Sequence, residues 1–283
     1  MQRTTLGDFE LTMLTDGGYY LDGGAMFGVV PKVLWSKNIQ PDELNRLRLG
    51  LNTLVVRTGT GRDDKTIVIE TGIGNKLPDK SVKIYENEML LMRQLEEAGV
   101  DPGRVDIVIN THLHFDHCGW NTIRKSDGSI AATFPRAKYY MQRGELAHAH
   151  EQHERDRVSY LTDNYDPLVA NGQAVILDGD AQIAPGISVR MFPGHTTYHM
   201  AVILESNGKR ACYIGDLIPT SAHLHPTWVM GYDLDPIACI DNRHRFYKDA
   251  IPERWLVVFT HDPKVPWAYI SKDEAGKYAF EKP

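Results

Sequence analysis

One stretch, Thr111-His-Leu-His-Phe-Asp-His-Cys-Gly, constrains the fold of this chain more than any other part of its sequence. It follows the apolar run Val105-Asp-Ile-Val-Ile-Asn, which has the length and composition of a buried strand. Burying imidazoles and a carboxylate is costly unless every polar group has a partner. Metal coordination supplies such partners, and the candidate ligands in this stretch are His112, His114, Asp116 and His117.

The spacing of these residues indicates how they divide between ions. His112 and His114 stand two residues apart directly after the predicted strand, so in an extended turn both imidazoles can face a single cation. Asp116 and His117 fall where the chain turns toward the next element, so they can serve a neighbouring ion. The fold must therefore place the end of this strand beside a metal site.

The rest of the chain alternates between strand and helix patterns. The β-branched runs 51–58 and 65–71, with a Gly/Asp-rich turn between them, predict a hairpin. Helical spacing of apolar residues predicts a helix over 82–99 that ends at Gly99, and dense charge predicts another over 142–162. Further strands are predicted at 105–110, 174–177, 187–192, 200–205, 211–214 and 255–260. Two β-rich halves with helices predict an α/β sandwich of sheets covered by helices.

Length and composition bound the remaining choices. The 283 residues contain no Pro/Ser-rich linker and no short repeat, so we expect a single domain over 1–283. A net charge of -6 gives no general attraction for nucleic acid or anionic lipid. No apolar run of membrane-spanning length and no apolar leader segment is present, so no membrane partner is expected. Three widely spaced cysteines, without a CxxC pair, indicate reduced thiols and a cytoplasmic location.

The motif His112-x-His114-x-Asp116-His117 resembles the signature of the metallo-β-lactamase superfamily, and further pieces of that family's pattern follow in order. They are Phe192-Pro-Gly-His195-Thr, Tyr213-Ile-Gly-Asp216 and Val258-Phe-Thr-His261-Asp. The resemblance implies an αββα sandwich, with two mixed β-sheets flanked by helices and metals at one edge between the sheets. Taken singly, His195 and Asp216 read equally well as structural loop residues.

The resemblance also implies a ligand set. The first metal would have His112, His114 and His195, the second Asp116, His117 and His261, with Asp216 bridging. Five imidazoles and two carboxylates suit two zinc ions, with manganese, iron, cobalt and nickel as alternatives. A hydroxide bridging the ions would attack the substrate, which makes the protein a dinuclear metallohydrolase. Asp116 and Asp216 are the carboxylates to which we assign catalytic roles.

The amino-terminal segment 14–35 resembles the branch that includes quorum-quenching N-acyl homoserine lactonases and, more distantly, organophosphatases similar to methyl parathion hydrolase. The implied substrate is a lactone. Met26 and Phe27 lie in a Gly-rich stretch, and we expect them to bind substrate by lining an apolar groove for an acyl chain. The alternative for this segment is a structural lid or a contact in a homodimer.

One departure concerns the proton donor. Some lactonases of this branch carry a tyrosine a few residues after the bridging aspartate, whereas residues 217–225 contain none. His223 is a candidate replacement that would contact substrate and donate a proton, with a structural histidine as the alternative. We expect Asp116 or water to supply most of the protons. Organophosphate, aryl ester and β-lactam hydrolysis are the alternative activities, and a noncatalytic metal-binding protein is the alternative of another class.

Overall fold

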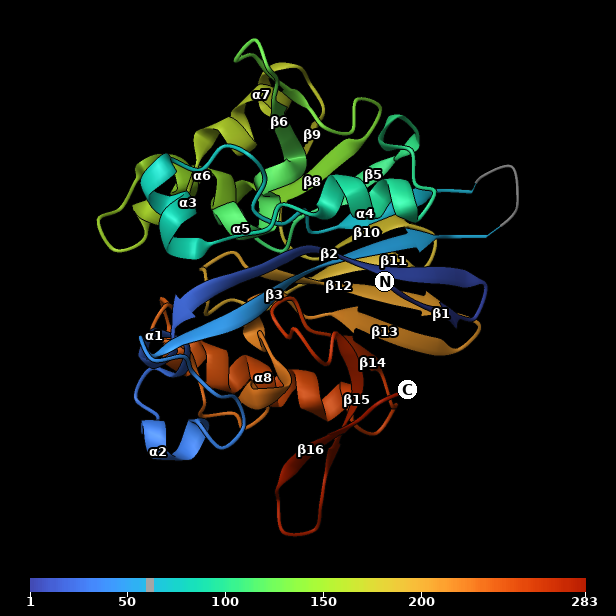
Figure 1. Cartoon of the computed structure of the whole chain (residues 1–283). Helices are drawn as coiled ribbons and strands as arrows, with labels where there is room; N and C mark the ends of the chain where they lie inside the picture. Colours follow the sequence, from blue (N-terminus) through green and yellow to red (C-terminus); the bar gives the residue numbers. More distant parts are fainter. Residues whose placement is uncertain (60–63) are drawn as a thin grey trace.

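Two seven-stranded sheets lie face to face in the computed structural model, which describes residues 1–59 and 64–283 (Figure 1). The first sheet has the order β1 (Gln2–Leu6), β2 (Phe9–Asp22), β3 (Arg46–Arg57), β4 (Thr66–Ile69), β5 (Ile107–Ile109), β8 (Lys138–Gln142), β9 (Ala174–Leu177). The second has the order β10 (Ala181–Ala184), β11 (Ile187–Met191), β12 (Met200–Ser206), β13 (Lys209–Tyr213), β14 (Leu256–Val258), β15 (Trp267–Lys272), β16 (Tyr278–Glu281). A separate small hairpin pairs β6 (Thr122–Arg124) with β7 (Ile130–Ala132).

Both large sheets are mixed, and the parallel pairs position the functional loops. Strands β4, β5, β8 and β9 run parallel, and so do β13 and β14, whereas the other neighbouring pairs are antiparallel. Parallel neighbours end at the same edge of a sheet. The loops after β4 and β5 therefore leave the first sheet side by side, and those after β13 and β14 leave the second in the same way.

The main core lies between the sheets. Alternate residues of each strand face it, as a period of two requires: Leu54 and Val56 of β3 point into this core, while Val55 packs on the outer face. From the second sheet, Val202, Tyr213 and Val258 meet them. All of these side chains are almost completely buried, so contact between the sheets is mainly apolar.

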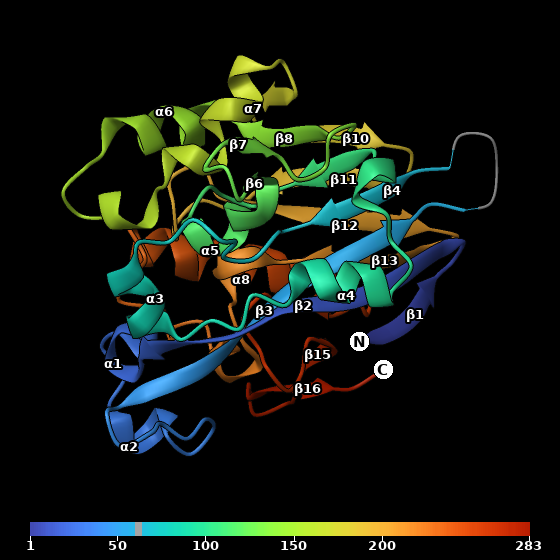
Figure 2. The same ribbon diagram turned by 45° about the horizontal axis from the view of Figure 1, so that its top comes forward.

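Helices cover the two outer faces (Figures 1 and 2). Side chains of α4 (Leu91–Glu97), α6 (Arg143–Glu151) and α7 (Asp166–Ala170) pack on the first sheet, and α8 (Pro236–Ala250) packs on the second. The shorter helices are α1 (Gly23–Phe27), α2 (Lys32–Trp35), α3 (Asp79–Tyr85) and α5 (Phe115–Cys118). Single turns are η1 (Pro102–Arg104), η2 (Gly119–Asn121), η3 (Arg157–Ser159), η4 (Thr162–Asn164), η5 (Gly215–Leu217) and η6 (Ser221–His223). The predicted αββα architecture is confirmed.

The long helices predicted over 82–99 and 142–162 are wrong in extent. The first is two helices, because Glu86 and Met89 adopt positive φ values of 51° and 50°. The second ends at Glu151, where Gln152 is left-handed with φ 52°. The hairpin strands predicted near 51–58 and 65–71 are present as β3 and β4, and residues 60–63 of their turn lie outside the described residues.

Segment 14–35, despite its glycines, consists largely of regular elements. The long strand β2 continues to Asp22, whose carboxylate accepts from the Ala25 N–H at 2.9 Å and begins α1. Helix α2 follows after Pro31. None of the helices in the described part of the chain combines the length and the hydropathy that a membrane span requires.

Candidate metal centre

The segment that follows β5 carries four of the predicted ligands: His112 and His114 lie in the loop before α5, and Asp116 and His117 lie in α5 itself. The ends of neighbouring strands hold its backbone. The Thr111 N–H donates to the Glu70 carboxylate, which lies just after β4. The Thr71 N–H and the Asn110 side chain both donate to the His117 carbonyl, at 2.8 and 3.0 Å. The loop is therefore fixed by hydrogen bonds between adjacent parallel strands, which explains how a short polar segment stays ordered while buried.

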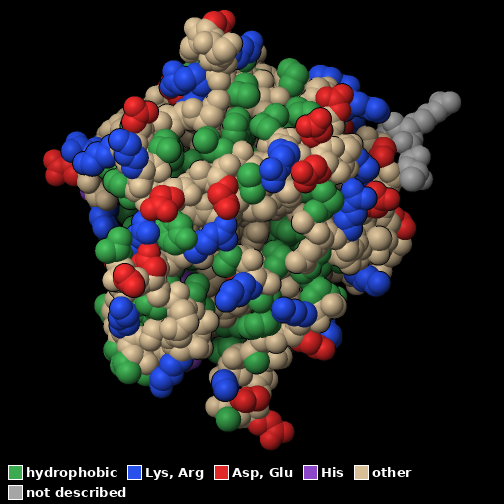
Figure 3. Space-filling model, viewed as in Figure 1, with side chains coloured by type: hydrophobic (Ala, Val, Ile, Leu, Met, Phe, Trp, Pro, Cys, Tyr) green, Lys and Arg blue, Asp and Glu red, His purple; other side chains and the backbone are tan. Residues whose placement is uncertain are grey.

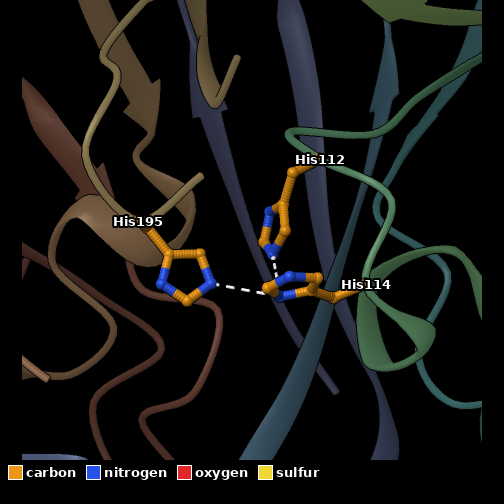
Figure 4. Close-up of side chains that lie close together, drawn as sticks. All are labelled: His112, His114 and His195. Atoms are coloured by element: carbon orange, nitrogen blue, oxygen red, sulfur yellow. Dashed lines mark hydrogen bonds between the residues drawn. The ribbon is translucent and has the colours of Figure 1, made fainter. Parts of the chain in front are cut away.

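Three imidazole nitrogens converge beside the end of β5 (Figure 4). Nε2 of His112 lies 3.0 Å from Nδ1 of His114, and Nε2 of His195 lies 3.1 Å from that same atom. His195 arrives from the loop after β11 in the opposite sheet. Two nitrogens bound to one zinc-sized ion at about 2.0–2.1 Å and a tetrahedral angle lie about 3.3 Å apart. The observed separations fit one such ion.

A second cluster lies beside the first. Nε2 of His117 and Nε2 of His261 are 3.2 Å apart. Oδ2 of Asp116 lies 3.7 Å from the first of these nitrogens and 3.6 Å from the second. All three side chains are largely buried, and His261 comes from the loop after β14. Their ligand atoms fit a second cation with nitrogen and oxygen donors.

Asp216 lies between the two clusters with one carboxylate oxygen toward each. Oδ2 is 3.3 Å from Nε2 of His195, and Oδ1 is 3.1 Å from Nε2 of His261. Oδ1 is buried and has no hydrogen-bond partner among the described residues. The residue before it, Gly215, has φ 59°, and a Cβ there would lie 2.4 Å from Nε2 of His199, so the turn requires glycine.

Outer hydrogen-bond partners orient the ring nitrogens. Nδ1 of His195 contacts the Asp233 carboxylate at 2.9 Å, and Nδ1 of His117 lies 2.7 Å from the Glu70 carboxylate. Nδ1 of His261 donates to the Gly50 carbonyl at 3.0 Å. Because Asp233 and the Gly50 carbonyl accept hydrogen bonds, Nδ1 of His195 and of His261 carries the hydrogen and Nε2 of each turns its lone pair inward. The Glu70 carboxylate forms an ion pair with His117. This arrangement is typical of histidines that bind a metal.

The electrostatics of the centre also suit cations. Burial, together with the neighbouring imidazoles, holds the pKa of His112 and His114 well below the usual histidine value, so both are neutral donors. Burial lowers the pKa of His117, but the carboxylates of Asp216, Asp116 and Glu70 outweigh it and raise that pKa well above the usual value. The carboxylates thus favour positive charge here, which a divalent cation also supplies.

The structure brings all seven sequence-predicted ligands together: His112, His114, His195, Asp116, His117, His261 and Asp216. Their donor types, their convergence and the unpartnered Oδ1 of Asp216 fit divalent cations of the zinc type. A purely structural polar core would instead pair each of these atoms within the protein.

Sequence reasoning missed the outer partners. Glu145 of α6 is fully buried and accepts hydrogen bonds from the Leu113 N–H, the Thr196 hydroxyl and the Tyr160 hydroxyl, at 3.1, 2.7 and 3.0 Å. It thereby ties the His112–His114 loop to the His195 loop. Glu70 and Asp233 were missed in the same way, as was Tyr19, whose hydroxyl donates to Asp116. Each is an isolated residue far from the motifs, so no local pattern marks it.

The residues predicted to bind substrate, Met26, Phe27 and His223, are buried in the protein and do not face an open groove. Met26 and Phe27 are 1% and 0% exposed, so they do not line an open groove. The Phe27 ring stacks between Trp35 and His223, with centroids 5.0 and 4.3 Å away. His223 is also buried, and both of its ring nitrogens are engaged: Nδ1 contacts the Thr220 hydroxyl at 2.7 Å and Nε2 contacts the Met26 carbonyl at 2.9 Å. The prediction overlooked that this apolar segment folds inward.

The family resemblance of the ligand motifs extends over most of the sequence. The sequence profile of the Metallo-beta-lactamase superfamily matches residues 48–261. An N-acyl homoserine lactonase from a Bacillus species is 30% identical over 112 residues, which is 40% of this chain and 38% of that protein. Another, from Bacillus thuringiensis, is 23% identical over 169 residues, 59% of this chain and 60% of that protein. The chain thus matches less than two thirds of the length of these relatives.

Solved structures agree over nearly the whole chain. A probable metal-dependent hydrolase from Staphylococcus aureus superposes with a TM-score of 0.87 at 28% identity, covering 99% of both chains. AidC, described as a dizinc quorum-quenching lactonase, superposes with a TM-score of 0.81 at 19% identity, covering 100% of this chain and 97% of its own. Because the family profile covers most of the sequence, including every residue of the two clusters, the chain belongs to the metallo-β-lactamase superfamily.

Proposed function

We propose that this protein is a hydrolase that uses two divalent cations, zinc first among them, to open the lactone ring of N-acyl homoserine lactones or related lactones. The observation that carries the proposal is the pair of donor clusters joined by Asp216, whose two oxygens face one cluster each. Similarity to N-acyl homoserine lactonases supports the substrate class. A noncatalytic scaffold would have no use for so complete a set of inward-facing donors.

His112, His114 and His195 would hold one ion, Asp116, His117 and His261 the other, and Asp216 would contact both. When bound, such ions lower the pKa of water to about 7 and polarise an ester carbonyl. The imidazoles add no charge as ligands, and Asp116 and Asp216 offset only part of the charge of two divalent ions. The remaining positive charge favours the anionic transition state of ester hydrolysis.

The leaving alkoxide of an opened lactone needs a proton, and we propose that Asp116 or water supplies it. Asp116 lies at the edge of the centre and keeps 9% of its surface exposed, so it can reach a bound substrate. His223 is less suited, because both of its ring nitrogens are engaged by Thr220 and Met26. Moving this histidine toward a substrate would break two buried hydrogen bonds.

Aromatic side chains beside Asp116 are better placed to meet an acyl chain than Met26 or Phe27. Tyr85 of α3 stacks on Phe115 with ring centroids 5.1 Å apart. Burial, followed by the Asp116 carboxylate, raises the pKa of Tyr85, and burial likewise raises the pKa of Tyr232, which is 37% exposed. Both phenols therefore stay neutral, and a wall of neutral rings suits an apolar chain.

A substrate panel tests the proposal. Metal-loaded protein should hydrolyse N-acyl homoserine lactones faster than a phosphotriester, a nitrophenyl ester or a cephalosporin, with chelator-treated protein as the inactive control. Faster hydrolysis of the phosphotriester or the cephalosporin would mean that this compound, and not the lactone, represents the substrate class of the same site. No turnover of any member by protein that holds two ions would refute the hydrolase proposal.

The same proposal covers partners and compartment. We propose a single domain that acts on a small-molecule ester or lactone in the cytoplasm, since all three cysteines are buried and unpaired. Basic and acidic side chains are interspersed on the face shown in Figure 3, which gives that face no continuous basic stripe for nucleic acid. Val33 and Leu34 of α2 and the nearby Val29 have exposed side chains, which supports the alternative role of this segment as a homodimer contact.

A further inference from the structure

Tyr19 brings a phenol to the second donor cluster from a strand remote in sequence. It lies near the end of β2, where its Cα pairs with Leu49 of β3. Its hydroxyl oxygen is 2.7 Å from Oδ2 of Asp116 and 3.5 Å from Nδ1 of His261. The side chain is 1% exposed, so water has little access to the hydroxyl. The centre therefore has a tyrosine beside it, although residues 217–225, which follow Asp216, contain none.

The single hydroxyl hydrogen of Tyr19 can be assigned from its neighbours. Nδ1 of His261 lies 3.0 Å from the Gly50 carbonyl, which can only accept a hydrogen bond, so Nδ1 carries its own hydrogen. The Tyr19 hydroxyl cannot donate to that nitrogen. Its remaining neighbour is the Asp116 carboxylate, which accepts the hydrogen at a distance typical of a charge-assisted hydrogen bond.

The Asp116 side chain has little else to orient it within the protein. Among the described residues, Tyr19 provides the one hydrogen bond to the Asp116 side chain. The same oxygen, Oδ2, faces the second cluster, at 3.7 Å from Nε2 of His117 and 3.6 Å from Nε2 of His261. The bond to Tyr19 therefore selects the rotamer in which Oδ2 points at the cation position.

The sheet holds Tyr19 rigidly. Its ring lies 5.6 Å from the His261 ring and 6.3 Å from the Tyr85 ring, and its backbone is paired within the long β2–β3 ladder. Asp116, in contrast, stands in the four-residue helix α5. A donor on a strand can fix a ligand on a short helix because the strand has less freedom to move.

We propose that Tyr19 is a positioning residue that holds Asp116 toward His117 and His261 and thereby strengthens binding of the second cation. The inference rests on the proposed function only in that Asp116 is taken as a ligand. Outer hydrogen-bond partners of metal ligands typically change metal affinity by about 10- to 100-fold, and that is the size of effect expected from this hydroxyl.

The test compares Tyr19→Phe with Tyr20→Phe. The first change removes only the hydroxyl, and the second makes the same change on the next residue, whose ring packs under the Arg46 guanidinium at 4.6 Å. Zinc is titrated into the metal-free full chain against a chromophoric chelator. Tyr19→Phe should weaken the second zinc by about 10- to 100-fold and leave the first unchanged, with no change in Tyr20→Phe. Wild-type affinity for both ions in Tyr19→Phe, or an equal loss for both, would overturn the proposal.

A double-mutant cycle separates positioning from general loosening of the fold. If Tyr19 acts through Asp116, Tyr19→Phe should cause no further loss of zinc affinity in an Asp116→Ala background, whereas an additive loss would overturn the proposal. The readout is zinc binding, so it does not depend on turnover. Protein that binds two zinc ions but opens no lactone would refute the proposed function and still decide the role of Tyr19.

Discussion

A substitution of Phe27 can show whether α1 belongs to the core or forms a wall of the substrate site. The Phe27 ring is fully buried, parallel to Trp35 at 5° and to His223 at 7°, with Trp228 nearly perpendicular at 86°. Truncating a buried phenylalanine costs about 3–5 kcal/mol, and each aromatic pair contributes about 0.5–1.5 kcal/mol beyond its buried area. Phe27→Ala should therefore lower the free energy of unfolding by about 4 kcal/mol.

Guanidinium denaturation of metal-loaded protein measures this loss. The matched control is Val29→Ala, because Val29 is 90% exposed and its truncation should change stability by less than about 0.5 kcal/mol. A loss below about 1 kcal/mol in Phe27→Ala, combined with a raised KM for long-chain lactones only, would refute the structural reasoning and restore the groove wall. A changed mass in light scattering, without either effect, would instead indicate a dimer contact.

Three further predictions concern the metal centre. Purified protein should hold close to two transition-metal ions per chain. Asp216→Ala should hold at most one, because Asp216 faces both clusters. Plasma emission analysis that finds one ion or none in the wild-type protein would contradict this prediction. Glu145→Gln should weaken zinc binding by about 10- to 100-fold, because the amide group of Gln would point an N–H at the Leu113 N–H or the Thr196 hydroxyl, which now donate to the carboxylate and so connect the two ligand loops. Unchanged zinc affinity in competition with a chelator would contradict this prediction. His223→Ala should lower kcat by about tenfold or less, whereas a loss of about 10² to 10⁴ with metal content unchanged, and a smaller loss for a nitrophenyl ester, would make His223 the proton donor.

The ligand loops could be predicted because each follows a strand that is recognisable by its own composition. Apolar runs precede His112, His195, Asp216 and His261, and binding residues commonly lie on loops that a rigid scaffold positions. Each residue alone could be structural, but the metal-ligand types recurring in this order favour a site. Residues that act within one loop or one strand end therefore leave a local signal.

Helix boundaries were less accessible to sequence reasoning. The apolar spacing over 82–99 suits one helix, but Asp16 of β2 accepts the Leu91 N–H and the Trp120 indole N–H, both at 2.9 Å. This buried carboxylate holds the start of α4 against the sheet, and the chain bends between Tyr85 and Leu91. A long-range hydrogen bond has overridden a local preference, which no window of neighbouring residues could reveal.

Sequence reasoning also could not tell that Phe27 and His223 are buried. An apolar segment has equal hydropathy whether it lines a groove or fills a core. Only packing against Trp35 and Trp228, which lie 8 and 201 positions along the chain from Phe27, decided that its ring is enclosed.

The amino-acid sequence by itself determined which residues could bind metal and that sheets covered by helices would present them, because donor chemistry and strand periodicity are local properties. The tertiary structure alone decided how those donors are held. Contacts across loops and sheets join Glu70, Asp233 and Tyr19 to the ligands, over as many as 97 positions for Tyr19 and Asp116, and Glu145 ties together residues next to the ligands. Their roles arise from distances between strands, which exist only once the two sheets have packed together.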